Sequence, residues 1–287
     1  MIRQHHLIKP AVALSAIAAA LLVAACGGSS SSGRPSGVNA VRAAYVSSSG
    51  PGYQIAMKVT GNAAGHTINV TGTGAFSQAA HAGRMTMHMN PPTLGREDLQ
   101  IDEVILGKDV YLKLPASLAG KMPGGKPWLE LNLSEIGKRA GIQGLSSLAD
   151  TTGENPAHFL QFLRAGSSGS VQNLGHQMID GVNTSGSRAT IDLSKVVDAL
   201  PASQRPSASS AIASIENLTG LHYLPITAWV DSSDHVRRII VSATGHVEGQ
   251  PFSENIQVDF VKYGPEPVPA APPTAEVTNL MSLFGTH

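Results

Sequence analysis

The sequence predicts an α+β protein built on one long, curved antiparallel sheet, with short helices packed against one face. Two observations predict it. Apolar and polar side chains alternate in many short segments, which are separated by Gly, Pro, Asn and Asp. Helix start signals gather instead in the middle of the chain, around Asn155-Pro156 and residues 194–218. We expect about ten strands in hairpin order, in two sheet-forming halves that flank the helices.

The N-terminus has the layout of an export signal. Arg3 and Lys9 give it a basic start without any acidic residue. Residues 10–25 then form an apolar run of sixteen residues, short of the ~20 that a spanning helix needs. A charged start followed by a short apolar run is typical of a signal peptide. We expect residues 1–25 to be removed on export.

The only cysteine of the chain, Cys26, ends this apolar run in the sequence LVAAC. We interpret residues 22–26 as a lipobox, in which cleavage precedes Cys26 and its thiol takes up diacylglycerol. The alternative is an unmodified cysteine buried in an uncleaved anchor. Residues 26–37 are a Gly/Ser-rich tether with a reach of roughly 20 Å. The expected location is the outer face of the cell membrane, held through Cys26 by membrane lipid, palmitate included.

Period-two alternation predicts the strands in both halves of the chain. In the first half, Tyr53 to Val59 sets the pattern, and Gly107-Lys108 marks a hairpin turn. In the second half, Asp180-Gly181 is a strong two-residue hairpin signal. The expected strands are residues 53–60, 67–76, 84–90, 99–106, 110–114, 129–133, 171–179, 182–193, 226–230, 236–243 and 256–263.

Helix signals are fewer and weaker than strand signals. Asn155-Pro156 combines a cap with proline at the first helical position. The proline-rich residues 264–273 must be extended, and residues 277–284 are expected to form a helical turn or a loose end. The expected helices are residues 38–46, 134–139, 156–164, 194–200 and 206–218.

Charge and motif content exclude several functions. Loss of Arg3 and Lys9 with the signal peptide leaves 18 basic against 20 acidic residues, a net charge of −2. Nucleic-acid binding would require a clear basic excess. The sequence has no G-x-S-x-G, S-x-x-K, P-loop or H-E-x-x-H motif, and its histidines are scattered. We therefore expect no enzyme activity, no catalytic residue, no metal site and no cofactor.

Two acidic neighbours, Asp102 and Glu103, are the one adjacent carboxylate pair that the sequence singles out. On a strand they point to opposite faces, so they cannot act on one substrate atom. We expect both to be solvated turn or edge residues.

One apolar face stands out in the first half. Met85, Met87 and Met89 alternate along one segment, and Gly72 and Gly74 share the apolar side of its neighbour. Methionine is flexible and fills irregular apolar space. This face is either a pliable cavity wall for an acyl chain, with the glycines leaving room, or an ordinary core. The candidate lining residues are Ile55, Met57, Val59, Ile68, Val70, Phe76, Met85, Met87, Met89, Val110, Leu112, Leu129, Leu131, Phe159 and Phe162.

The order of these segments resembles that of actinobacterial LppX/LprG-type lipoproteins, which are LolA-like in fold. The resemblance covers nearly all of the chain after Cys26. It is carried by YQIAM at residues 53–57, VTGTGAF at 70–76, DVYLKLP at 109–115, KPWLEL at 126–131, NP at 155–156, FLQFL at 159–163, DGV at 180–182, RATIDL at 188–193 and ITAWVD at 226–231.

The resemblance implies a β half-barrel wrapped on helices, with an apolar cavity for acyl lipid or lipoglycan, over residues 38–264. Residues 265–287 would be a proline-rich tail. It further implies lipid transport across the envelope beside a membrane exporter, and we expect a monomer. The alternative is a non-enzymatic envelope accessory, scaffold or sensor lipoprotein with a solid core. The sparse aromatic residues and the proline-rich tail depart from the family pattern.

Overall fold

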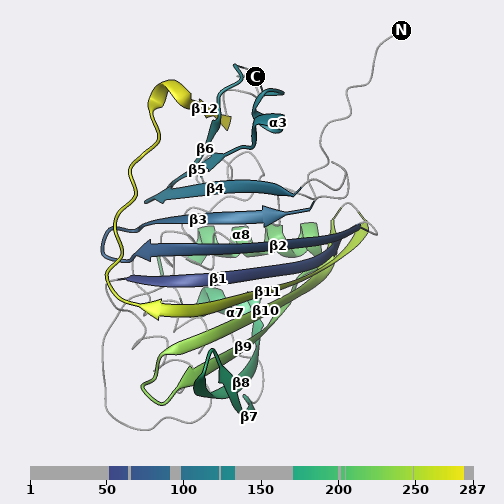
Figure 1. Cartoon of the computed structure of the whole chain (residues 1–287). Coiled ribbons are helices and arrows are strands. Elements are labelled where there is room, and N and C mark those ends of the chain that lie inside the picture. Colours follow the sequence, from purple (N-terminus) through teal and green to yellow (C-terminus); the bar gives the residue numbers. More distant parts are fainter. Residues whose placement is uncertain are drawn as a thin grey trace.

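The computed structural model describes residues 52–63, 66–90, 98–122, 124–132, 171–199, 202–203, 205–247 and 249–280. Within them, twelve strands form one sheet in the order β12-β6-β5-β4-β3-β2-β1-β11-β10-β9-β8-β7. The sheet is curved, and it stays open because β12 and β7 stand at its two ends (Figure 1). The predicted antiparallel sheet is confirmed. Cys26, the tether and the helices expected at 38–46, 134–139 and 156–164, with Phe159 and Phe162, lie outside the described residues.

The first half of the sheet is a meander in which each strand pairs with the next. At the hairpin expected around Gly107-Lys108, Gly107 adopts a left-handed φ of 62°, a conformation that glycine accepts without steric cost. The short helix α3 (Ala116–Ala119) connects the last two strands. These strands are β1 (Gly52–Ala63), β2 (His66–Ser77), β3 (Ala82–Met89), β4 (Leu99–Leu106), β5 (Asp109–Lys113) and β6 (Trp128–Asn132).

The second half is another meander, interrupted by helices. Asp180 and Gly181 have φ values of 47° and 78°, as a type I′ hairpin requires. After β8 come α7 (Leu193–Val196), η2 (Val197–Ala199) and α8 (Arg205–Thr219), close to the predicted helices. The strands are β7 (Gln172–Ile179), β8 (Val182–Asp192), β9 (Tyr223–Asp231), β10 (Val236–Val247) and β11 (Gln250–Tyr263).

The first strand and the last long strand join the two halves. β1 pairs antiparallel with β11, from Tyr53 opposite Tyr263 to Ala63 opposite Phe252. β1 therefore has a partner on each side, β2 and β11. No local pattern predicts this pairing, because the two strands lie at opposite ends of the described chain.

The segment after β11 ends in a strand. Residues 264–273 are extended, as predicted, and run past the ends of several strands (Figure 1). After η3 (Thr274–Glu276), β12 (Val277–Asn279) pairs in parallel with β6. The helical turn or loose end expected over 277–284 is therefore wrong for 277–279. Polar contacts hold this segment: Gln54 Nε2 donates to Glu266 Oε1 at 2.8 Å, and Lys126 Nζ donates to the Val277 carbonyl at 2.9 Å.

The two faces of the sheet differ. We call the face with Ile55, Met57 and Val59 the inner face and the opposite one the outer face. α8 lies on the inner side, behind the sheet in Figure 1. A Cβ built on Gly245, on the inner face of β10, would lie only 2.3 Å from the Thr219 carbonyl oxygen at the end of α8. The glycine thus lets the helix approach the sheet closely.

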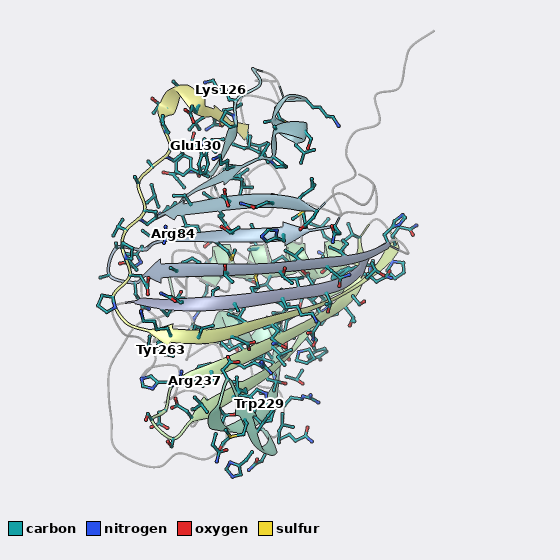
Figure 2. All side chains as sticks on the ribbon, viewed as in Figure 1. Arg84, Lys126, Glu130, Trp229, Arg237 and Tyr263 are labelled. Carbon is teal, nitrogen blue, oxygen red and sulfur yellow. The ribbon has the colours of Figure 1, made fainter. Side chains whose placement is uncertain are left out.

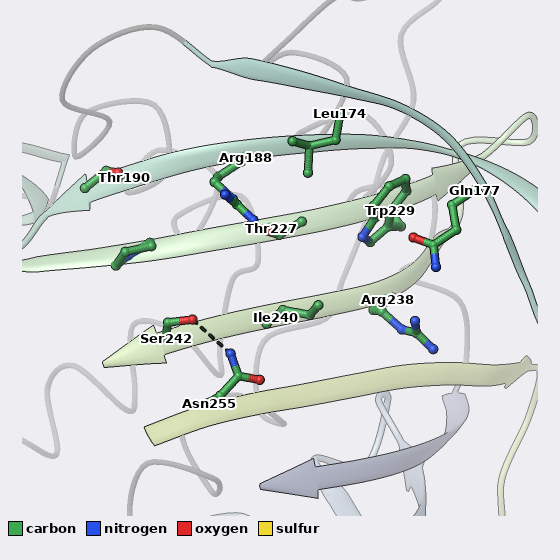
Figure 3. A pocket seen from close by; sticks show the side chains of 11 residues that line it. Leu174, Gln177, Arg188, Thr190, Thr227, Trp229, Arg238, Ile240, Ser242 and Asn255 are labelled. Atoms are coloured by element: carbon green, nitrogen blue, oxygen red, sulfur yellow. Dashed lines mark hydrogen bonds between the residues drawn. The ribbon is translucent and has the colours of Figure 1, made fainter. Parts of the chain in front are cut away.

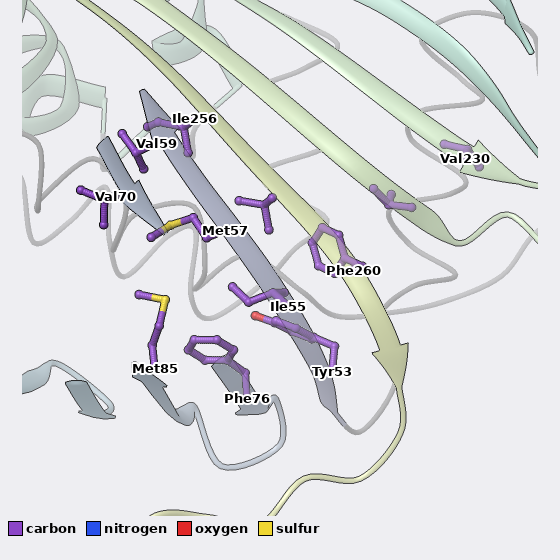
Figure 4. Close-up of a cluster of buried hydrophobic side chains, with 12 residues drawn as sticks. Tyr53, Ile55, Met57, Val59, Val70, Phe76, Met85, Val230, Ile256 and Phe260 are labelled. Atoms are coloured by element: carbon purple, nitrogen blue, oxygen red, sulfur yellow. The ribbon is translucent and has the colours of Figure 1, made fainter. Parts of the chain in front are cut away.

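The core lies on the inner face around β1. Its centre is aromatic although the chain has few aromatic residues (Figure 4). The Tyr53 ring lies 5.4 Å from Phe76 and 5.5 Å from Phe260, and Phe260 lies 5.8 Å from Tyr263, between ring centroids. The Tyr263 hydroxyl donates to the Val236 carbonyl. This cluster connects β2, β1 and β11 to the start of β10.

Glycines make room for the Phe76 ring. A Cβ on Gly83 of β3 would lie 2.0 Å from Phe76 Cδ1, and one on Gly74 would lie 2.8 Å from Phe76 Cε2. Real Cβ atoms never come so close, so the ring occupies the space that these two glycines leave.

Replacing Gly83 by alanine should therefore destabilise the fold. The ring is stacked on Tyr53 and cannot easily withdraw, so we expect the free energy of unfolding to fall by about 1–3 kcal/mol. Urea denaturation measures this. In the Phe76→Leu background the same substitution should cost much less, because the ring is gone. An equal cost in both backgrounds would contradict the packing explanation.

Candidate functional site

The predicted lining residues that the structure describes share the inner face. Cross-strand register places Met57 beside Gly72, Gly72 beside Met87, and Met87 beside Ile101. Leu112 and Leu129 are partners farther along the same face. The face is continuous from β11 to β6. It carries Ile55, Met57, Val59, Ile68, Val70, Phe76, Met85, Met87, Met89, Val110, Leu112, Leu129 and Leu131.

The methionines of this face are unequally covered. Met57 and Met85 are buried, whereas Met87 and Met89 are half-buried beside the core cluster. A Cβ on Gly72 would lie 3.2 Å from Met87 Cγ and 3.7 Å from Met57 Cε. The room that Gly72 leaves is thus taken by the chain's own side chains. Whether these residues line a cavity stays a prediction.

Glu103 interrupts the apolar face. Its cross-strand partners are Met85 and Leu112, both on the inner face, and only 5% of its surface is exposed. The expectation that it is solvated is therefore wrong. No hydrogen bond or ion pair reaches its carboxyl from the described part of the chain. Burial raises the pKa of Glu103 from 4.5 to about 7, because an apolar environment disfavours the charged form.

Asp102, its neighbour, points to the outer face, as strand alternation predicts. It accepts hydrogen bonds from Thr86 Oγ1 and Gln100 Nε2, both at 3.0 Å. Only Glu103 is thus enclosed by apolar side chains.

A second, half-buried carboxyl lies at the other end of the inner face. Glu254 of β11 pairs with Gly61 and Ala243. Its Oε1 is buried and has no hydrogen-bond partner among the described residues, and burial raises its pKa. The inner face is thus largely apolar but carries two carboxyl groups whose pKa is raised by burial.

The outer face carries a hollow of about 680 Å³ over the second half of the sheet (Figure 3). Side chains from five strands, β7 to β11, line it, among them Leu174, Arg188, Trp229, Arg238 and Asn255. In Figure 2, Trp229 and Arg84 lie on the side of the sheet that faces the viewer, opposite α8. The hollow and the core therefore lie on opposite sides of the sheet.

Local irregularities shape this hollow. Leu174 is the extra residue of a β-bulge, since Asn173 pairs with Ser187 and Gly175 with Gly186. The Trp229 ring lies against Gly186, where a Cβ would come within 2.4 Å of it. Reasoning from sequence missed this site. The available signal was one arginine on the polar side of each of two predicted strands, Arg188 on β8 and Arg238 on β10. Only the pairing of both strands with β9 places these arginines in one hollow.

The described part of the chain offers no metal site and no helix that could cross a membrane. Among these residues, no group of three or more His, Cys, Asp and Glu side chains could hold a metal ion. None of the helices described is both long enough and apolar enough to cross a membrane.

Comparisons with known proteins find solved structures that are similar at low identity. No protein-family model matches the chain, and no curated protein matches it. The crystal structure of Mycobacterium tuberculosis lipoprotein LppX is similar, with 14% identity and a TM-score of 0.43, over 81% of this chain and 96% of that chain. LprF from Mycobacterium bovis has 12% identity and a TM-score of 0.40, over 81% and 95%. A DUF1329 family protein from Desulfovibrio piger has 10% identity and a TM-score of 0.27, over 78% and 91%.

The first two structures bear names of the LppX/LprG type that the sequence resembles. At these identities and TM-scores the similarity carries no information on function, ligand or partner.

The burial of Glu103 predicts a pH dependence of stability. Its folded pKa lies above its unfolded value, so the folded state holds the proton more tightly. The stabilisation that Glu103 contributes is fully present below about pH 4.5 and is lost as the pH rises through about 7. The loss attributable to this group is about 3 kcal/mol.

Glu103→Gln removes the titrating group and keeps the size of the side chain. Relative to the unmodified chain, this variant should gain about 3 kcal/mol in free energy of unfolding between pH 4.5 and 8. Urea denaturation across this range tests the difference directly. Parallel pH profiles for the two proteins would show that the carboxyl is not buried.

Proposed function

We propose that this chain is an exported, lipid-anchored envelope protein whose inner face binds acyl chains of a lipid or lipoglycan and helps to carry them across the envelope. The observation that carries the proposal is the broad, largely apolar inner face of an open sheet. The lipobox at residues 22–26 and the resemblance noted from the sequence support the anchor. The function needs no catalytic group.

Transfer energies favour a carrier of this kind. Moving an acyl chain from membrane to water costs about 0.8 kcal/mol per methylene, on the order of 12 kcal/mol for a C16 chain. An apolar protein surface that replaces the membrane removes most of this cost. The carrier then needs apolar area and few polar groups, as on the inner face.

The methionines supply the flexibility that such binding requires. Met57 and Met87 fill the space beside Gly72, so an incoming acyl chain must displace them. Unbranched thioether side chains rearrange at small cost. We propose that the strip of Met57, Met85, Met87 and Met89 opens to admit the acyl chain.

Lipid uptake tests the proposal. Protein without residues 1–26 should co-purify with acyl lipid or take up a C16 lipid, as seen by native mass spectrometry. Met87→Trp should lower uptake several-fold while changing the free energy of unfolding little, since the bulky ring occupies the strip. His88→Trp is the matched control, because His88 is exposed on the outer face of the same strand. Protein that stays empty with every lipid would refute lipid binding.

A second candidate function is an envelope accessory, scaffold or sensor with a solid core. The filling of the space at Gly74 and Gly83 by the Phe76 ring favours it. In that case no lipid is taken up and Met87→Trp acts on stability alone.

The anchor has its own test. Cells fed an alkyne analogue of palmitate should incorporate it into this protein and retain the protein in the membrane fraction. Cys26→Ala should abolish the label and release the protein, because it removes the only thiol. A label that survives this substitution would contradict lipidation at Cys26.

A further inference from the structure

The hollow on the outer face has the size and lining of a small-molecule site. Its volume of about 680 Å³ lies within the roughly 300–1,000 Å³ usual for such sites. Leu174, Trp229 and Ile240 give it apolar walls, and five uncharged polar side chains also line it. It is separate from the inner face and from any lipid bound there.

The two arginines of the hollow differ in their partners. Arg238 binds Asp259 through two hydrogen bonds, and Gln257 also donates to Asp259 at 2.9 Å. Its charge is therefore neutralised. Arg188 donates from Nε to the Thr227 hydroxyl at 3.2 Å and pairs with no carboxylate among the described residues. No described residue forms a hydrogen bond with its terminal nitrogens, which can therefore bind an anion in bidentate fashion.

The remaining polar groups suit a ligand with many hydroxyls. Asn255 donates to the Ser242 hydroxyl at 2.9 Å, while Gln177 and Thr190 line other parts of the hollow (Figure 3). Hydroxyls and amides both donate and accept, as sugar hydroxyls require. A fatty acid would leave these groups unpaired, which costs affinity. A nucleotide base would find no open ring to stack on, because Trp229 is only 9% exposed.

We propose that this hollow binds an anionic saccharide, with Arg188 holding its carboxylate or phosphate and the uncharged polar side chains contacting its hydroxyls. The inference is independent of lipid binding, since the two surfaces lie on opposite sides of the sheet. It gives the protein a second ligand, a charged sugar or glycan segment.

Isothermal titration calorimetry tests the site with trigalacturonic acid and glucose 6-phosphate as probes. The neutral trisaccharide maltotriose is the control ligand. We expect binding of at least one anionic sugar and much weaker binding of maltotriose. Arg188→Gln should weaken the affinity for the anionic sugar by about tenfold to a hundredfold, which is the contribution of one charge-assisted hydrogen bond.

Arg84→Gln is the matched control variant, because Arg84 is exposed on the outer face of β3, away from the hollow (Figure 2). It should bind like the unmodified protein. Ser242→Trp fills the hollow without changing its charge and should abolish binding, with folding checked by thermal unfolding. No binding of either anionic sugar, equal binding of maltotriose, or undiminished binding by Arg188→Gln would each overturn the proposal.

Discussion

The pairing of β1 with β11 is the constraint on which the rest of the structure depends. Each half of the sheet is a meander of local hairpins, and this one long-range ladder joins them. It also assembles the core, since Tyr53 comes from β1 while Phe260 and Tyr263 come from β11. Without it, neither half would bury the inner face of its first or last strand. The cost of closing so long a loop is offset by the apolar burial along both strands.

The same ladder separates two chemical environments. Side chains alternate across the sheet, so the apolar inner face and the polar outer face follow from one register. The inner face suits acyl chains and the outer hollow suits a charged sugar. A single layer of strands thus separates the two proposed ligand-binding surfaces.

The buried carboxyls are the local exception to this division. A charged group amid methionine and leucine is costly, and burial accordingly raises the pKa of Glu103 to about 7. Natural cores tolerate such groups mostly where function requires them. Glu103 and Glu254 are thus the two carboxyls that interrupt the apolar inner face.

Sequence alone predicted most strands, the Asp180-Gly181 hairpin, a helix at 206–218 that the structure places at Arg205–Thr219, and most residues that share the inner face. These features are encoded locally, in periodicity, turn residues and caps. The burial of Glu103 and the strand β12 were mispredicted. Both depend on contacts with segments that are distant in the sequence. The hollow was missed for the same reason, since Arg188, Trp229 and Arg238 stand on three different strands.

The sequence by itself determined the alternation, and with it which side chains stand together on each face. Only the tertiary structure decided what covers each face, because that depends on β1 meeting β11 across some two hundred residues. Local patterns carry no information on a contact at that separation. The apolar character of the inner face was therefore predictable, whereas its filled packing, its buried carboxyl and the hollow behind it were not.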